Sequence, residues 1–317
     1  MSLAFVFPGQ GSQSVGMLAG LAAADPIVRQ TFAEASAVLG YDLWALVQEG
    51  PAEELGVTEK TQPAMLAAGV ATWRVWRGQG GAEPVAMAGH SLGEYSALVC
   101  SGAMEFGAGI DLVRTRGQLM QEAVPLGQGA MAAILGLDDA DVVAACSEAA
   151  QGQVVEAVNF NAPGQVVIAG QTSAVERAIE TAKARGAKRA LLLPVSVPSH
   201  SSLMTGAAEK LAIHLQQVEI QMPKVPDVFT VDVQTHTSPD GIRKALTEQL
   251  HKPVRWADTV RAMLAGGVRT IIECGPGKVL TSLNRRIQKG PELAVLAIDE
   301  PESLARALAT CRERQNA

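Results

Sequence analysis

The sequence predicts an α/β fold in which helices cover both faces of a parallel sheet. Short apolar runs alternate with helix-compatible segments on both sides of the middle of the chain, as parallel strands and their crossover helices do. The composition agrees, because 31 glycines and 4% aromatic residues suit close helix–sheet packing better than an all-β sandwich. A β-α-β-β-α-β order within residues 131–195 predicts a small ferredoxin-like domain inserted into the larger one.

The chain opens with an apolar run, 3–7, that predicts a buried strand and leads into the loop 8–13 (PGQGSQ). A Gly-rich loop directly after a strand usually contacts a phosphate, an oxyanion or a neighbouring turn. Its letters fit neither G-x-G-x-x-G nor the Walker pattern with its lysine, which argues against nucleotide binding. A tight turn without a ligand is the alternative. Helices are expected over 25–40, 43–54 and 61–77.

Residues 89–93 (GHSLG) are the stretch on which the predicted chemistry depends. A strand is expected over 84–88 and a helix over 92–100, so the glycines flanking Ser91 match a nucleophile elbow. Such a turn exposes the serine Oγ at a helix N-terminus, where negative charge is favoured. We therefore predict that Ser91 is a covalent nucleophile, with a plain Gly-rich turn as the alternative.

The inserted domain is predicted over 125–195, which leaves 1–124 and 196–317 to the large domain. Its strands are expected at 131–137, 154–158, 165–169 and 188–195, its helices at 138–150 and 173–185, with a loop over 159–164 (NFNAPG). The large domain then continues with a Pro-rich connection through Pro223 and Pro226. Its later helices are expected at 202–215, 242–251, 257–265, 279–287 and in the tail, and its strands at 269–274 and 293–298.

A nucleophilic serine needs a base, and His200 is the best of the five histidines. It follows a strand end and precedes a helix, and open α/β sheets place their sites at such carboxyl ends. A capping or packing histidine is the alternative. His90 adjoins Ser91, so its side chain is expected to point away from Oγ. The other three, which end or lie in surface segments, are His214, His236 and His251.

No acidic residue between Ser91 and His200 lies at an obvious strand end of the large domain, so the acceptor that orients the imidazole is expected to be a carbonyl or an amide. This favours a dyad over a triad. Arg116 lies on a helix expected over 107–124. An arginine there is more often solvated, but one that points inward would clamp a carboxylate with two prongs and so select acyl groups carrying a free acid.

Charge and cysteine content exclude several classes of function. A net charge of −6 argues against nucleic acid as the main partner. Four widely spaced cysteines form no C-x-x-C pair, which argues against a disulfide framework or a metal site and favours a cytoplasmic protein. The N-terminus lacks the features of a signal peptide, and no apolar run approaches the roughly 18 residues that span a bilayer. We expect a monomer.

Taken together, these motifs resemble the malonyl-CoA:acyl carrier protein transacylase family, and the resemblance runs essentially from end to end. Seven segments carry it in order: 7–13 (FPGQGSQ), 89–95 (GHSLGEY), 113–117 (VRTRG), 161–165 (NAPGQ), 197–200 (VPSH), 249–256 (QLHKPVRW without H and K) and 273–277 (ECGPG). It implies a hydrolase-like α/β domain with a ferredoxin-like insert, as the order of elements already suggests.

The resemblance also implies a role for each site residue. Ser91 takes the malonyl group as an ester, and His200 is the base and later the acid. The backbone N–H groups of Gln10 and Leu92 form the oxyanion hole. Two further roles concern substrate and base: Arg116 pairs with the malonate carboxylate, and the main-chain carbonyl of Gln249 orients His200.

Coenzyme A thioester and an acidic acyl carrier protein are the implied partners, with no metal or redox cofactor. Two basic clusters are candidate docking patches, since charge complementarity steers association. They are Lys183, Arg185, Lys188 and Arg189 in the insert, and Arg285, Arg286 and Lys289 in a late helix. Two other functions stay open: a serine esterase or thioesterase, and a catalytically silent module that docks the carrier.

Overall fold

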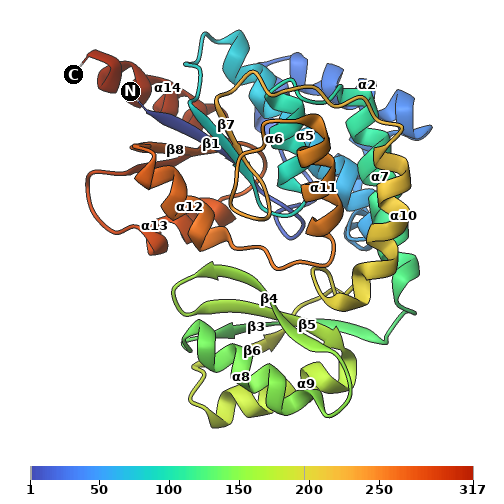
Figure 1. The fold of residues 1–317 in the computed structure, drawn as a ribbon. Helices are drawn as coiled ribbons and strands as arrows, with labels where there is room; N and C mark the ends of the chain where they lie inside the picture. The colour runs from blue at the N-terminus through green and yellow to red at the C-terminus, as the bar shows by residue number, and fades with distance from the viewer. Residues whose placement is uncertain (1, 196, 317) are drawn as a thin grey trace.

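A computed structural model describes residues 2–195 and 197–316. Figure 1 shows two domains: a large domain built around one sheet and, below it, a small domain inserted between α7 and η1. The α/β fold class with an inserted ferredoxin-like unit is therefore confirmed. The predicted domain boundary at Ser196 lies outside the described residues, and the division at 125–195 stays a prediction.

The large domain is built on a five-stranded sheet with the order β7-β2-β1-β8-β9. All its pairings are parallel, and β1 lies at the centre with Val6 opposite Ala88 of β2 and Glu273 of β8. The carboxyl ends of β1 and β2 therefore meet at one edge. The strands are β1 (Leu3–Phe7), β2 (Ala86–Gly89), β7 (Asp227–Phe229), β8 (Thr270–Glu273) and β9 (Ala294–Ala297).

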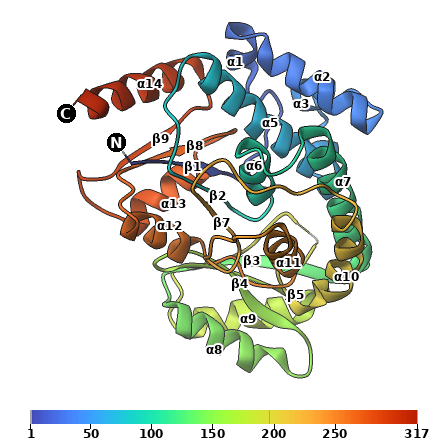
Figure 2. The same cartoon turned by 45° about the horizontal axis from the view of Figure 1, so that its top comes forward.

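Helices cover both faces of this sheet because β1 presents apolar side chains on each of its two faces. Leu3, Phe5 and Phe7 belong to the core shared with α5 and α6, whereas Ala4 and Val6 pack with α12 and α13 (Figure 2). The helices are α1 (Ala19–Ala24), α2 (Ile27–Leu39), α3 (Leu43–Glu49), α4 (Ala52–Leu55), α5 (Thr58–Gly78), α6 (Gly93–Cys100), α7 (Phe106–Ala123), η1 (Ser202–Met204), α10 (Thr205–Leu215), α11 (Pro239–Gln249), α12 (Trp256–Ala265), α13 (Val279–Ile287) and α14 (Pro301–Asn316).

The small domain is a four-stranded antiparallel sheet with the order β4-β5-β3-β6, covered on one face by two helices. Those helices lie on the side away from the large domain, so the bare face of the sheet is turned toward it (Figure 1). The elements are β3 (Gly129–Leu135), α8 (Asp139–Ala150), β4 (Val155–Ala162), β5 (Gln165–Gln171), α9 (Thr172–Ala184) and β6 (Arg189–Leu192).

Hydrogen bonds join β4 to the large domain. The Phe160 N–H donates to the Val254 carbonyl at 2.9 Å, and the Val254 N–H donates to the Val158 carbonyl at 2.8 Å. The ring of His90 shares a 2.8 Å hydrogen bond with the Asn161 side chain. The wall that the small domain forms beside the elbow is thus held by directional contacts.

Several elements differ from the sequence predictions. The helix predicted over 43–54 is two helices, α3 and α4, separated by Gly50 and Pro51, and α1 was not predicted. The segment predicted as a Pro-rich connection contains β7, because a three-residue edge strand after Pro226 is too short to show a period. The predicted loop 159–164 is mostly strand, since β4 runs on to Ala162 through two irregularities in its register with β5. None of the helices in the part of the chain described here has the length and hydropathy needed to span a bilayer.

Candidate active site

The turn that carries Ser91 depends on two glycines. A Cβ at Gly89 would lie 1.8 Å from the carbonyl carbon of Gly93, and a Cβ at Gly93 would lie 2.0 Å from the Phe7 carbonyl oxygen. Only glycine permits this approach of β2, α6 and β1. Ser91 itself has φ +52°, a left-handed conformation that costs energy and lifts its side chain out of the turn.

The imidazole of His200 faces the Ser91 hydroxyl. Its Nε2 lies 2.7 Å from Oγ, and its Nδ1 lies 2.7 Å from the main-chain carbonyl oxygen of Gln249. Because a carbonyl can only accept, Nδ1 carries the proton, and Nε2 is left to accept from the serine hydroxyl. The backbone of His200 is also left-handed, at φ +66°, and its N–H donates to the Leu250 carbonyl at 2.9 Å.

His200 is neutral over the ordinary pH range. Burial, helped by the positive charge of Arg116 and opposed by the Gln249 carbonyl, lowers the pKa of its imidazole to about 3. A neutral imidazole beside a serine hydroxyl is able to accept its proton.

Arg116 points inward, so the expectation of a solvated arginine is wrong and the inward alternative holds. Its side chain is 1% exposed. The Nη2 group donates to the Gln249 Oε1 at 2.9 Å and to the Ser91 Oγ at 3.2 Å, and Nε has no partner among the described residues. No carboxylate lies within ion-pair distance of this guanidinium in the described part of the chain. The charge is therefore available to an acyl group that carries an acid.

Two side-chain contributions were missed from the sequence. The Gln249 amide, of which only the main-chain carbonyl was assigned a role, donates from Nε2 to the Ser91 carbonyl at 3.0 Å and to Glu94 Oε2 at 2.7 Å. Glu94 stands in the first turn of α6, where an acid is expected merely to favour the helix dipole. The available signal was its place in the GHSLGEY stretch, three residues after Ser91.

Gln10 and Leu92 both line the cavity above Ser91, which has a volume of about 390 Å³. Across residues 2–195 and 197–316, neither of their backbone N–H groups has a main-chain carbonyl acceptor. The same cavity is walled by Met131 and Asn159 of the small domain, and His200 lies at its base. The structure thus gathers Gln10, Ser91, Leu92, Arg116 and His200 around a single cavity, and Gln249 stands behind His200 and Arg116.

Comparison with known proteins fits this geometry. Residues 4–299 match the acyl transferase domain family. The malonyl CoA-acyl carrier protein transacylase of Escherichia coli K12 is 61% identical over 96% of this chain and 98% of that protein. The chain belongs to the malonyl-CoA:acyl carrier protein transacylase family. The predicted family and the predicted acyltransferase class are confirmed.

Further members of the family extend the match. The transacylase of Bacillus subtilis is 43% identical over 99% of this chain and 98% of its own. A solved complex of a type II PKS acyl carrier protein with its malonyl-transacylase superposes with a TM-score of 0.96 at 58% identity, covering 98% of this chain and 100% of that one. An acyl carrier protein S-malonyltransferase from Vibrio cholerae superposes with a TM-score of 0.93 at 58% identity, covering 96% of this chain and 99% of that one.

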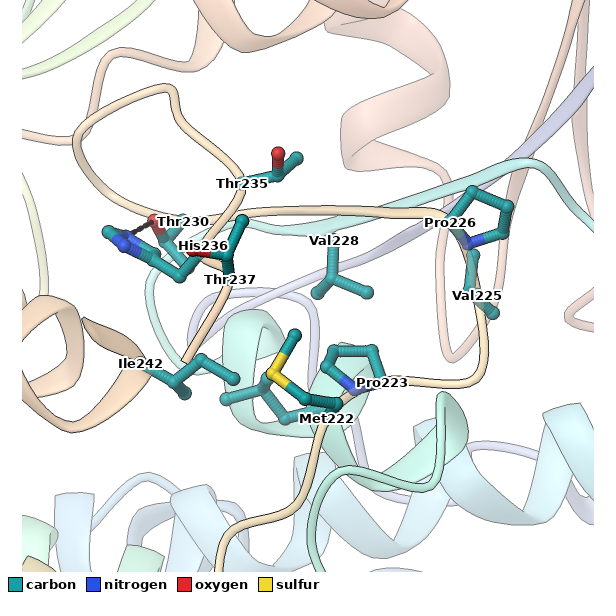
Figure 3. Close-up of a pocket in the computed structure, with 11 residues that line it drawn as sticks. Met222, Pro223, Val225, Pro226, Val228, Thr230, Thr235, His236, Thr237 and Ile242 are labelled. Carbon is teal, nitrogen blue, oxygen red and sulfur yellow. Dashed lines mark hydrogen bonds between the residues drawn. The ribbon is translucent and has the colours of Figure 1, made fainter. Parts of the chain in front are cut away.

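Two of the remaining histidines have partners other than the Ser91 hydroxyl. His90 turns toward the small domain, where it bonds Asn161 and lies 5.7 Å from the Trp256 ring centroid. His236 lines a separate cavity of about 130 Å³, shown in Figure 3, and its Nε2 lies 3.0 Å from the Thr230 hydroxyl. These two side chains therefore hold loops and domains in place.

Neither basic cluster lines the Ser91 cavity, and the two differ in their charge balance. Arg185 in the insert pairs with Glu148 at 3.0 Å. In α13, Arg285 donates to the Val295 carbonyl at 3.0 Å and Arg286 to the Pro163 carbonyl at 3.2 Å, which are neutral acceptors. Among the described residues, no group of three His, Cys, Asp or Glu side chains is arranged to hold a metal ion.

Proposed function

We propose that this chain transfers a malonyl group from malonyl-CoA to the pantetheine thiol of an acyl carrier protein through an ester on Ser91. The observation that carries the proposal is the convergence on one oxygen: Ser91 Oγ lies 2.7 Å from His200 Nε2 and 3.2 Å from Arg116 Nη2. A nucleophile, its base and a cation for the acyl carboxylate are thus within reach of one thioester carbonyl.

The first half-reaction loads the enzyme. His200 Nε2 takes the proton as Ser91 Oγ attacks the thioester carbonyl, and the tetrahedral oxyanion accepts hydrogen bonds from the Gln10 and Leu92 N–H groups. Each such donor typically contributes about 3–4 kcal/mol to the transition state. The carbon–sulfur bond then breaks, His200 returns the proton to the departing sulfur, and coenzyme A leaves as a thiol.

The second half-reaction reverses the roles. The carrier thiol gives its proton to His200 and attacks the Ser91 ester, and the proton passes back to Oγ as the carbon–oxygen bond breaks. Because one site serves both steps, ping-pong kinetics are expected. No electron is gained or lost, so no redox cofactor is needed, and we propose that the oxyanion hole polarises the carbonyl in place of a metal.

The Gln249 carbonyl supplies the support that a triad takes from an acid. It holds His200 in the tautomer with the proton on Nδ1, which a carboxylate would also do. Unlike a carboxylate, a carbonyl adds no full negative charge beside the imidazolium that forms during attack. The positive charge of Arg116, which donates to Ser91 Oγ, therefore faces no carboxylate on the orienting group of His200.

The carrier is proposed to dock on the α13 cluster, because neutral acceptors leave the charges of Arg285 and Arg286 uncompensated. Reversing the charge with Arg286→Glu should raise the KM for the carrier without changing malonyl loading from malonyl-CoA; an unchanged KM would refute this choice.

We infer a monomer, testable by light scattering, and a cytoplasmic location from four cysteines that are all free thiols.

The test of the function is incubation with malonyl-CoA, with and without holo-carrier. We expect a malonyl adduct on Ser91 by intact mass, its transfer to the carrier thiol, and no adduct in Ser91→Ala. Rapid hydrolysis that the carrier does not divert would instead indicate a thioesterase. Absence of any adduct on the wild-type protein would indicate the silent docking module.

A further inference from the structure

Glu94 is a buried carboxyl that the transfer mechanism does not use. It lies in the first turn of α6 and is 2% exposed. Burial is costly for a carboxylate that lacks a cation or several hydrogen bonds. Glu94 has one side-chain partner, the Gln249 amide at 2.7 Å, while its Oε1 has none within the described residues. Such a poorly supported acid beside an active site calls for a role.

The contact with Gln249 fixes which way that amide faces. Its Nε2 donates to two acceptors, Glu94 Oε2 and the Ser91 carbonyl, which leaves Oε1 to accept from Arg116 at 2.9 Å. A flipped amide would point its N–H groups at the N–H groups of Arg116, two donors facing each other. Glu94 therefore acts on the guanidinium through one intervening side chain.

The Glu94 carboxyl does not contact the Arg116 guanidinium directly. The structure has no ion pair between Glu94 and Arg116 within 4.0 Å, although both are buried. Burial raises the pKa of Glu94 to about 8. The charged groups that face it oppose each other, because Asp232 from the segment after β7 raises this pKa and Arg116 from α7 lowers it.

We propose that Glu94 is a positioning residue for the acyl-carboxylate clamp: through Gln249 it holds Arg116 against Ser91, and its protonation leaves the guanidinium charge to the substrate. The inference rests on the proposed function. When Glu94 ionises, a second anion shares the Arg116 charge, and the malonyl carboxylate binds less well. Glu94 thus sets both the geometry of the clamp and the pH range in which it selects an acid.

The sign follows from linkage. A malonyl carboxylate on Arg116 adds a negative charge near Glu94 and raises its pKa above that of the free enzyme, so loading takes up a proton. Malonyl binding is therefore strongest below the free-enzyme pKa of about 8 and weakens as the pH rises through it. An acetyl group carries no charge, so its loading has no such dependence.

The experiment measures kcat/KM for malonyl-CoA and acetyl-CoA with the holo-carrier between pH 6.5 and 9.5. Any effect of the ionisation of the carrier thiol is the same for both substrates and cancels in the ratio of the two kcat/KM values. His200 does not titrate in this range. We expect the wild-type ratio to fall by about fivefold between pH 7 and pH 9. A ratio that does not change with pH, in an enzyme that does transfer malonyl, would overturn the proposal and leave the function intact.

Two substitutions separate charge from geometry. Glu94→Gln keeps an acceptor for the Gln249 amide, so the ratio at pH 7 should stay within about threefold of wild type while its alkaline fall disappears. Glu94→Met keeps the side-chain length but removes the hydrogen-bond acceptor. At every pH, kcat/KM for malonyl-CoA should therefore fall by a factor at least about tenfold larger than kcat/KM for acetyl-CoA. Equal losses for both substrates in Glu94→Met would make Glu94 merely structural.

Two further variants keep the test decisive if Glu94 variants do not fold. Asp232→Asn removes the anion that raises the pKa of Glu94, so the alkaline fall should move to lower pH; a fall that stays in place would contradict the proposal. Glu34→Gln is the matched control, because it removes an exposed glutamate that pairs with Arg74 away from the site, and it should retain the wild-type profile. If the wild type transfers no malonyl at all, the proposed function has failed instead.

Discussion

Replacing Arg116 with alanine should remove the preference for acyl groups that carry a carboxylate. The guanidinium is 1% exposed, so the carboxylate that pairs with it is desolvated too. Breaking a buried pair by removing one partner typically costs about 3–5 kcal/mol. At 1.4 kcal/mol for each factor of ten, kcat/KM for malonyl-CoA should fall about 140-fold to 4,000-fold.

Acetyl transfer should lose far less. For that substrate, Arg116→Ala removes the 3.2 Å hydrogen bond to Ser91 Oγ, which is worth about 1.5–3 kcal/mol at most for a charged donor. It also removes the 2.9 Å hydrogen bond to Gln249 Oε1, which does not involve the acyl group. The loss of a positive charge that lowers the pKa of His200 also makes the imidazole a stronger base, which offsets part of this cost.

The assay measures the rate of Ser91 loading from labelled malonyl-CoA and from acetyl-CoA by rapid quench. A urea unfolding curve first establishes that the variant is folded under the assay conditions. Arg114→Ala is the control, two residues away and paired with Asp111 on the same helix. It should leave both rates within about twofold. An equal fractional loss of malonyl and acetyl loading in Arg116→Ala would show that the arginine only supports the fold.

Three other predictions follow from the same site. Gln249→Ala keeps the main-chain carbonyl on His200 but frees Arg116, so single-turnover rates should fall about tenfold for malonyl and less than threefold for acetyl; a comparable fall for both would mean that the backbone has moved. Since burial lowers the pKa of His200 to about 3, kcat/KM for malonyl-CoA should show no acid limb between pH 5 and 7; a midpoint near 6.5 would contradict this. The folded-state pKa of Glu94 is raised to about 8 from 4.5, so wild-type stability falls as the pH rises through that window. The unfolding free energy of Glu94→Gln relative to wild type should therefore increase from pH 5 to pH 8, as urea titrations can measure, and a constant difference would argue against a neutral buried acid.

Local sequence was sufficient wherever the chemistry depends on neighbours in the chain. The elbow follows from two glycines two residues either side of Ser91, since a side chain at either would collide with backbone. His200 was chosen on a premise that the structure contradicts, because the preceding strand, β6, ends at Leu192 and belongs to the antiparallel sheet of the small domain. The resemblance of ordered motifs then supplied roles for Gln10, Leu92 and the Gln249 carbonyl. The structure places Gln10 and Leu92 at the cavity above Ser91 and the Gln249 carbonyl 2.7 Å from His200 Nδ1.

What the sequence could not determine is which way long polar side chains point. Arg116 and Gln249 are 133 residues apart, and Gln249 and Glu94 are 155 apart. A helical period shows that a residue faces the interior, but it does not show which partner from another helix meets it there. The sequence by itself determined the fold class and singled out Ser91 and His200 as the candidate nucleophile and base. Only tertiary packing decided that Arg116 is buried beside Ser91 and that a protonatable carboxyl stands behind it, because desolvation and long-range hydrogen bonds arise from the assembled fold.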